Sequence, residues 1–254
     1  MNLLILDAGH AEKVAGKRNE KENFFEWKFN DSMQYKIKKR AEDHGITVYL
    51  TNPNPKGIDE IGLSKRATLA NNYWTKNNKP KAIFISLHAN AVDNTSARGT
   101  ETYHAKNAST TSKNFAKTLN DEIVKTMKSL DKNAKDRGVK SENFTVIYKA
   151  SMPSVLAEYG FYSNLDDLKI LKNNQDDLTE ATVRAICTYF GIQYKAKKTE
   201  VTTTVNTNTS TKTETWHRVV CGSFKSEEAA KARIKELESK GFNGNFIIKF
   251  EKQV

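Results

Sequence analysis

Three runs of apolar residues along the chain each lead to a residue that can carry chemistry. The longest run, AIFISLHAN at 82–90, has apolar residues at consecutive positions and ends close to His88. Such a run is typical of a strand that is covered on both faces, as in a parallel sheet between helices. NLLILD near the N-terminus leads to His10, and PSVLA leads to Glu158. Because ligands in open α/β sheets bind beyond the carboxyl ends of the strands, we expect these three side chains at one shared edge.

Other apolar positions repeat with the period of amphipathic helices. Apolar residues every four positions from Phe25 to Ala41 predict a helix that ends at Gly45. Further helices are predicted at 63–74, 115–127 and 178–190. Further strands are predicted at 46–50, 99–104, 145–148 and 155–159, and the segment DRG at 136–138 is predicted to be a charged loop. This alternation predicts an α/β fold in which a mostly parallel sheet is flanked by helices.

The chain changes character at a threonine-rich stretch. TEVTTTVNTNTSTKTET at 199–215 has no helical or core-forming pattern, so it predicts a linker. We therefore expect three parts: a large N-terminal domain over 1–195, a Thr-rich linker over 196–215 and a small C-terminal module over 216–254.

The C-terminal module has the pattern of a single βαβ unit. Strands are predicted at 216–222 and 245–250, and between them Ser226 is a good residue to begin a helix and Gly241 to end it. A unit of about 40 residues is small for an independent hydrophobic core.

Composition narrows the partners and the compartment. The 254 residues carry a formal net charge of +11, which favours an anionic partner: nucleic acid, a membrane surface or an anionic wall polymer. Cys187 and Cys221 lie far apart, so neither a disulfide framework nor a cysteine metal site is expected. No apolar run reaches membrane-spanning length, and no charged segment or cleavage site precedes the strand that begins by Leu3. We expect synthesis in the cytoplasm without a signal peptide, and no membrane insertion.

Two imidazoles and one carboxylate form the candidate metal site. Glu26 lies in the first turn of the predicted first helix, beside its apolar row, and is expected to face the sheet edge near His10 and His88. This donor set suits Zn²⁺ with an open fourth position for water. Zinc lowers the pKa of a bound water to about 7 and polarises a carbonyl, so an amide can be hydrolysed at neutral pH. Glu158 could accept the water's proton and pass it to the leaving amine.

These residues alone predict only a candidate metal hydrolase, because no HExxH helix is present. A lone histidine is more often a structural or surface residue than a ligand, and His44, His104 and His217 are assigned to that class. The coincidence of two imidazoles at two strand ends favours the metal site.

The chain also resembles a known family. The motifs that carry the likeness occur in order over residues 2–192: ILDAGH, E-x-x-x-N at Glu26 and Asn30, L-x-x-R-x-x-x-A-N at 63–71, FISLHAN, RGTETY at 98–103, DRGVK at 136–140 and PSVLAEYGFYSN at 153–164. Together they are similar to the zinc-dependent N-acetylmuramoyl-L-alanine amidases of the amidase-3 family. Ala8 and Ala11 stand where family members commonly have proline and glycine, which changes the stiffness of the loop and leaves the ligand in place.

The resemblance implies the roles of four residues and a substrate. The zinc ligands fall on His10, Glu26 and His88, and the catalytic glutamate falls on Glu158. The implied substrate is peptidoglycan, cut at the amide between the lactyl group of N-acetylmuramic acid and L-Ala of the stem peptide. Asn90, Arg66 and Arg137 also match family positions, but the sequence assigns them no role.

The C-terminal module resembles the start of a SPOR domain, a module that binds peptidoglycan glycan. SPOR domains are normally βαββαβ, and only one βαβ half is present here. We therefore hypothesise that two modules pair across chains in a homodimer, since a lone unit leaves strand edges uncovered. A catalytic domain joined by a linker to a small wall-binding module is typical of a phage endolysin, which would reach the wall through a holin; a sporulation lysin released at lysis is the alternative.

Three other functions stay open at this point. The first is a zinc peptidase that cuts within the stem peptide, and the second is a non-catalytic wall-binding protein. The third, a basic nucleic-acid binder, is disfavoured because no nucleic-acid motif with interleaved aromatic residues occurs.

Overall fold

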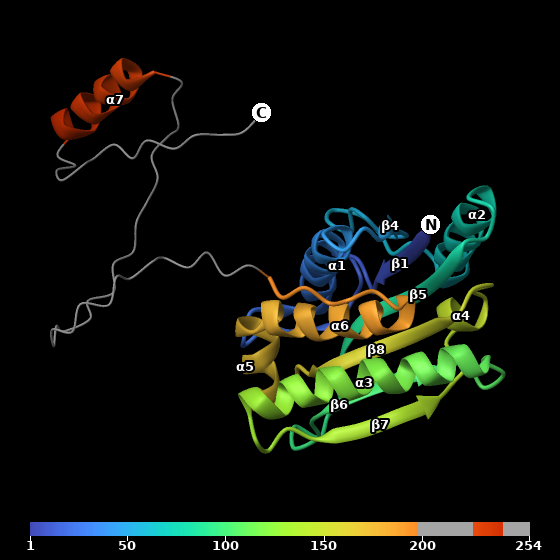
Figure 1. Ribbon diagram of the computed structural model, residues 1–254. Coiled ribbons are helices and arrows are strands. Elements are labelled where there is room, and N and C mark those ends of the chain that lie inside the picture. Colours follow the sequence, from blue (N-terminus) through green and yellow to red (C-terminus); the bar gives the residue numbers. More distant parts are fainter. Residues whose placement is uncertain (198–225, 241–254) are drawn as a thin grey trace, which may run out of the picture. The chain divides into compact units, whose positions relative to one another are not determined.

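The computed structural model describes residues 1–197 and 226–240. Contacts divide the chain into two units, Met1–Thr199 and Glu200–Val254. The first unit contains a six-stranded sheet (Figure 1). Its strands, in spatial order, are β4 (Thr47–Leu50), β1 (Asn2–Ala8), β5 (Lys81–Asn90), β8 (Ser154–Phe161), β6 (Thr100–His104) and β7 (Asp136–Ser141). All neighbouring pairs are parallel except β8 and β6, so the predicted mostly parallel α/β sheet is confirmed.

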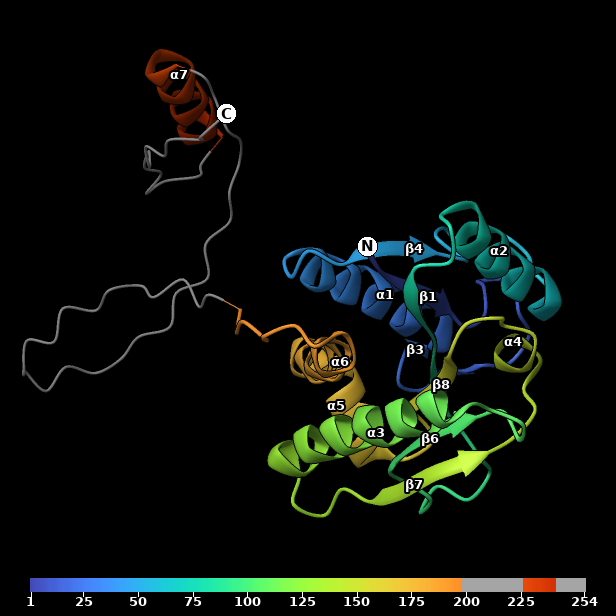
Figure 2. The same ribbon diagram turned by 45° about the vertical axis from the view of Figure 1, so that its right-hand side comes forward.

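Helices cover both faces of this sheet (Figure 2). On one face, α1 (Glu26–Glu42) and α3 (Thr110–Leu130) pack against the strands, and α6 (Gln175–Phe190) packs against these two helices. The other face is covered in part by α2 (Leu63–Lys76) and α4 (Thr145–Tyr148). The helix α5 (Leu165–Asn173) follows β8, and the two-residue strands β2 (Arg18–Asn19) and β3 (Phe24–Phe25) pair with each other in the loop before α1.

The face under α2 and α4 is divided into an apolar half and a polar half. Successive side chains of a strand point to opposite faces, so every second residue of each strand belongs to this face. At one end these residues are apolar and pack with α4 and α2: Leu3, Ile5, Phe84 and Leu156. Further along the same strands, and on the neighbouring β6, they are polar: Asp7, Ser86, His88, Glu158 and Glu101. We call these five residues the polar half; the opposite face carries the larger apolar core.

Two local predictions are wrong. Residues 145–148, predicted as a strand, form the short helix α4. Val146 and Ile147 are adjacent and both buried, and a single helical turn against the sheet allows both side chains to be buried on the same side. Asp136 to Gly138, predicted as a loop, begin the edge strand β7. That strand is largely exposed and therefore lacks the apolar pattern that reveals the central strands.

In the second unit the structure describes one helix, α7 (Glu227–Ser239). The side-chain oxygen of Ser226 accepts a hydrogen bond from the Ala229 backbone N–H, as the sequence predicted for the start of this helix. The strands predicted at 216–222 and 245–250, and the predicted linker beyond Lys197, lie outside the described residues. No helix in the part of the chain that the structure describes is long and apolar enough to cross a membrane.

Candidate metal centre

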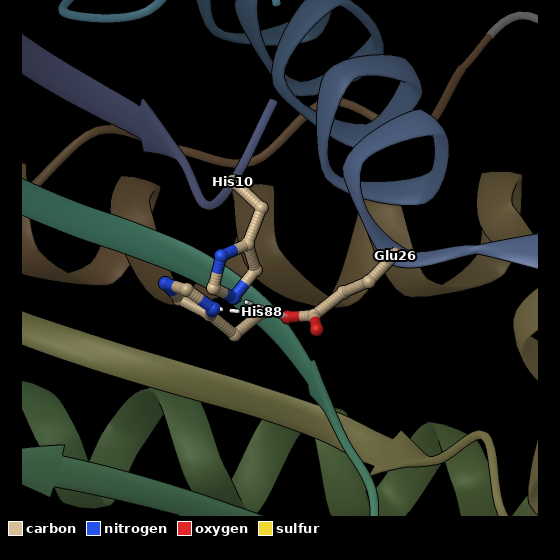
Figure 3. Close-up of side chains that lie close together, drawn as sticks. All are labelled: His10, Glu26 and His88. Atoms are coloured by element: carbon tan, nitrogen blue, oxygen red, sulfur yellow. Dashed lines mark hydrogen bonds and ion pairs between the residues drawn. The ribbon is translucent and has the colours of Figure 1, made fainter. Parts of the chain in front are cut away.

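The structure brings His10, Glu26 and His88 together from three elements (Figure 3). His10 lies just after β1, Glu26 is the first residue of α1, and His88 lies near the end of β5. One ligand atom from each residue lies within 4.8 Å of the other two. The Oε1 atom of Glu26 is 3.0 Å from His88 Nδ1 and 3.5 Å from His10 Nε2. Glu26 is only 2% exposed, in agreement with the expectation that it turns away from solvent.

The donor set and its spacing fit a tetrahedral metal ion. Ligand atoms bound at zinc's usual distances lie about 3.3 Å apart, close to the two separations from Glu26. Burial lowers the pKa of His10 to about 4, so its imidazole is neutral near pH 7, which is the form that binds metal. Burial opposes ionisation of Glu26, but His88 and His10 lower its pKa overall. The neutral imidazole of His10, the imidazole of His88 and the carboxylate of Glu26 therefore converge at one point.

Asparagine side chains hold the backbone that carries His10. His10 has a φ of 63°, in the left-handed region that costs a non-glycine residue about 1–3 kcal/mol. Asn52 Nδ2 donates to the carbonyls of Ala8 and His10, both at 3.0 Å. Asn30 Nδ2 donates to the carbonyl of Gly9 at 3.0 Å. The same segment is thus fixed from two sides.

Gly9 is required by the close approach of this segment to His88. A Cβ atom at position 9 would lie 2.1 Å from Cε1 of the His88 ring, a separation that real Cβ atoms do not show. The Gly9 N–H donates to the carbonyl of Leu87 at 3.1 Å, which ties the end of β1 to β5. The ligand-bearing loop therefore tolerates no side chain at this position.

A buried ion pair lies beside the metal centre in the polar half. Asp7 and Arg66 are both fully buried, and Arg66 Nη1 donates to Asp7 Oδ2 at 3.1 Å. Ser86 Oγ donates to the same carboxylate oxygen at 2.7 Å. Arg66 Nη2 reaches Oε1 of Glu60 at 3.4 Å, and that oxygen lies 3.3 Å from His10 Nδ1. Arg66, which the sequence left without a role, thus connects the polar half to the residue beside His10.

Glu158 lies next to the metal centre on the neighbouring strand. It is the cross-strand partner of His88, and β8 continues beyond it to Phe161, two residues past the strand end that the sequence predicted. Its Oε2 atom is buried and has no hydrogen-bond partner within the described residues. Burial, and then the charges of Glu26 and Glu101, raise the pKa of Glu158 well above its ordinary value. This carboxyl group is therefore suited to take up a proton.

Glu101 is a further buried carboxylate, and sequence reasoning missed it. It is the cross-strand partner of Glu158 in β6. Oε1 accepts hydrogen bonds from Asn90 Nδ2 at 2.8 Å and the Tyr103 hydroxyl at 2.7 Å. Oε2 accepts hydrogen bonds from Arg137 Nε at 2.6 Å and from the Lys140 ammonium group. Burial opposes ionisation, but these donors lower the pKa of Glu101 below its ordinary value. The signal available in the sequence was the pair of motifs RGTETY and DRGVK.

Comparison with protein families gives two matches along the chain. Residues 4–188 match the Amidase_3 model, described as N-acetylmuramoyl-L-alanine amidase. Residues 193–249 match the SPOR domain model. The second match begins before the module boundary that the sequence suggested at residue 216.

Individual relatives agree with the first match. The chain is 29% identical over 201 residues to an endolysin of Bacillus phage SPP1, covering 76% of this chain and 68% of the endolysin. It is 23% identical over 208 residues to a sporulation-specific N-acetylmuramoyl-L-alanine amidase of Bacillus subtilis, covering 82% and 69% of the two chains. The catalytic domain of CwlV, an N-acetylmuramoyl-L-alanine amidase from Bacillus (Paenibacillus) polymyxa var. colistinus, superposes with a TM-score of 0.64 at 28% identity, covering 76% of this chain and all of that domain.

Proposed function

The chain belongs to the Amidase_3 family of N-acetylmuramoyl-L-alanine amidases, and from this premise we propose that His10, Glu26 and His88 hold a zinc ion beside Glu158 as general base. The protein is a peptidoglycan amidase that acts on the cell wall. The observation that carries the proposal is the convergence of three metal-ligand atoms within 4.8 Å.

The scissile bond in this proposal is the amide between the lactyl group of N-acetylmuramic acid and L-Ala. When bound, zinc supplies a water of pKa near 7 and polarises the carbonyl of that amide. Glu158 accepts the proton of the attacking water and then delivers it to the nitrogen of the departing L-Ala. The raised pKa of Glu158 supports this role, because a carboxylate that is a stronger base accepts the proton of the water more readily.

Product analysis tests the reaction. The full chain is incubated with a defined muropeptide, and the products are identified by mass spectrometry. We expect an intact stem peptide with a free amino terminus on L-Ala, together with N-acetylmuramic acid carrying a free lactyl carboxylate. Products that keep L-Ala attached to the muramic acid would instead indicate a zinc peptidase acting within the stem peptide.

Metal analysis tests the ligand set. We expect chelation to abolish turnover of the muropeptide and added Zn²⁺ to restore it. His10→Ala should lose bound zinc and activity together, whereas His104→Ala should keep both, because His104 lies on β6 with its Nδ1 bonded to the Ala105 carbonyl. Retention of stoichiometric zinc by His10→Ala would remove His10 from the ligand set.

A second proposal concerns the C-terminal segment that matches the SPOR domain. SPOR domains bind peptidoglycan, and this supports a role for the segment in holding the enzyme on the wall. We propose that two such segments pair in a homodimer. Sedimentation should give a dimer for the full chain and a monomer for a chain that ends at residue 197; a monomeric full chain at all concentrations would contradict the pairing. We further propose that the enzyme reaches the wall when the producing cell is opened by a holin or by lysis.

A further inference from the structure

The guanidinium group of Arg137 is held on two sides. Its Nε atom donates to Oε2 of the buried Glu101 at 2.6 Å, and its Cζ atom lies 4.7 Å from the centre of the Phe161 ring. Its side chain is nevertheless 35% exposed. Within the described residues, Nη1 and Nη2 make no hydrogen bond or ion pair with the protein. The two-pronged edge of the guanidinium is therefore fixed in orientation while its donors stay available.

The charge around Arg137 is also unbalanced. Lys140 binds the same oxygen of Glu101, so two cations share one carboxylate. Both cationic side chains are about one-third exposed, whereas Glu101 is almost completely buried. A positive charge that is already ordered and accessible binds a carboxylate better than a flexible one, since less conformational entropy is lost on binding.

The position of Arg137 relative to the metal centre indicates which part of the substrate it meets. His88, Glu158, Glu101 and Gly138 are register neighbours across β5, β8, β6 and β7; we call them the site row. Neighbouring strands are about 4.8 Å apart, so β7 lies roughly 10 Å beyond Glu158, on the side away from His88. A Cβ added at Gly138 would meet nothing within 4 Å, so the far end of the row is open.

The direction of the substrate follows from the proton that Glu158 delivers. That proton goes to the nitrogen of L-Ala, so the bond to the muramic acid lies on the metal side of Glu158 and the peptide begins on the other side. An extended peptide advances about 3.3–3.6 Å per residue, so roughly three residues reach from Glu158 to β7. The stem peptide would therefore pass over Glu101 toward Arg137.

We propose that Arg137, assisted by Lys140, binds a free carboxylate carried by the second or the third residue of the stem peptide. The inference rests on the proposed function, because it takes the direction of the peptide from the role of Glu158. Arg137 then acts as a specificity-determining residue. Walls in which this carboxylate is amidated should be poorer substrates.

Synthetic muropeptides with and without the carboxylate test this proposal. One pair of substrates differs only in whether the α-carboxyl group of the second residue is free or amidated. The other pair differs only in whether the third residue carries a second carboxylate. With the wild-type full chain, kcat/KM should fall about tenfold or more within the pair that contains the recognised group, as expected for loss of a charge-assisted hydrogen bond. The pair that responds identifies the residue that is recognised.

Variants at position 137 complete the test. Arg137→Gln should lower kcat/KM about tenfold for the carboxylate substrate and leave the amidated one nearly unchanged, so that discrimination disappears. Arg137→Lys keeps a positive charge that can pair with Glu101 but loses the pair of Nη donors. This variant should therefore discriminate only weakly between the carboxylate and the amidated substrate. The matched control is Arg184→Gln: Arg184 is also anchored through Nε, to Glu122 at 2.6 Å, and is 29% exposed, but it lies on α6.

Three results would separate the possibilities. Equal losses on free and amidated substrates in Arg137→Gln would overturn the proposal and assign Arg137 to support of Glu101 alone. Equal rates of the wild type on both members of both pairs would also overturn it. Failure of the wild type to cut the amide next to muramic acid in any substrate would instead contradict the proposed function.

Discussion

Glu158 and Glu101 are cross-strand neighbours on the same face of one sheet, yet their surroundings are opposite. Glu101 accepts hydrogen bonds from four side chains, and its pKa is lowered. Glu158 has a buried oxygen without a partner within the described residues, and its pKa is raised. Burial acts in the same direction on both carboxyl groups, so the donors and neighbouring charges decide the difference.

The comparison distinguishes two roles for carboxyl groups in one site: orienting cations and exchanging a proton. A carboxylate that holds its charge can orient cations, and Glu101 orients Arg137 and Lys140. A carboxyl group that binds a proton readily can exchange one with substrate, and this suits Glu158 to the role proposed for it. The contrast arises from position in the sheet: Glu101 lies next to the edge strand that supplies cations, whereas Glu158 lies between Glu101 and the metal centre.

The largest expected effect is that of Glu158→Gln. The amide cannot accept and return the proton, so kcat should fall by about 10²–10⁴. Zinc content should not change, and the protein should unfold at the same or a slightly higher temperature, because the substitution replaces a carboxyl group whose buried Oε2 atom has no partner within the described residues. Assays of turnover, bound metal and thermal unfolding check this.

A matched control for Glu158→Gln is Glu142→Gln, in an exposed glutamate that pairs with Lys106. It should leave kcat unchanged. A Glu158→Gln enzyme that kept more than a tenth of its activity would break the comparison, since Glu158 and Glu101 would then differ only in environment and not in role.

Glu101→Gln should have a smaller but broader effect. It leaves Arg137 and Lys140 without their shared carboxylate, so the free energy of unfolding should fall by about 1–3 kcal/mol, as expected for loss of partly screened charged hydrogen bonds. Activity should fall about tenfold, because the guanidinium loses its orientation. Denaturant unfolding at constant m-value and kcat/KM measure the two effects.

The control for Glu101→Gln is Glu122→Gln, which removes the partner of Arg184 on the far side of the sheet. It should cost stability without changing activity. If Glu101→Gln lost activity by the factor expected for Glu158→Gln, the division into charge-holding and proton-exchanging carboxyl groups would be wrong.

The pH dependence of stability should distinguish the two carboxyl groups by sign. The folded-state pKa of Glu101 lies below its unfolded value, so its stabilisation is present above the unfolded pKa and is lost as pH falls through the folded one. The folded-state pKa of Glu158 lies above its unfolded value, so stability is lost as pH rises between those two values. Chemical unfolding of the metal-free wild type, Glu101→Gln and Glu158→Gln across the acid range gives the difference slopes. Slopes of the same sign for both variants would contradict the comparison.

The smallest effect is expected for Tyr103→Phe. This change removes one of the four donors to Glu101 and keeps the ring, which packs at 5.0 Å from that of Phe144. Stability should fall by about 0.5–1.5 kcal/mol, and kcat should stay within about threefold of the wild type. Thermal unfolding and initial rates suffice for the measurement, and a loss equal to that of Glu101→Gln would mean that the hydroxyl, and not the cations, dominates the environment of Glu101.

The sequence predicted the central strands and the fold class because these strands are buried on both sides. Leu3 to Leu6 are completely buried, and a run of apolar residues without alternation reports this directly. His10 and His88 were found because each follows such a run. Glu26 was found from its position beside the apolar row of a predicted helix, and not from a strand.

The rest depended on contacts that no local pattern records. The edge strand β7 is exposed and carries a single large apolar residue, Val139, so it was assigned to a loop, and the partners of Glu101 were missed with it. The antiparallel pairing of β8 and β6 brings Glu101 beside Glu158, and this requires the strand order. In α4, burial of adjacent residues overrode the preference of β-branched side chains for strands.

The division of one sheet face into an apolar half and a polar half has a practical consequence. Within the described residues, the two hydrophobic clusters lie in the apolar half and on the opposite face, and none of His10, Glu26, His88 and Glu158 belongs to either cluster. A single isosteric replacement at Glu158 should consequently yield an intact protein that engages its polymer without cutting it. Such an inactive variant could be used as a stable reagent to capture uncleaved wall fragments.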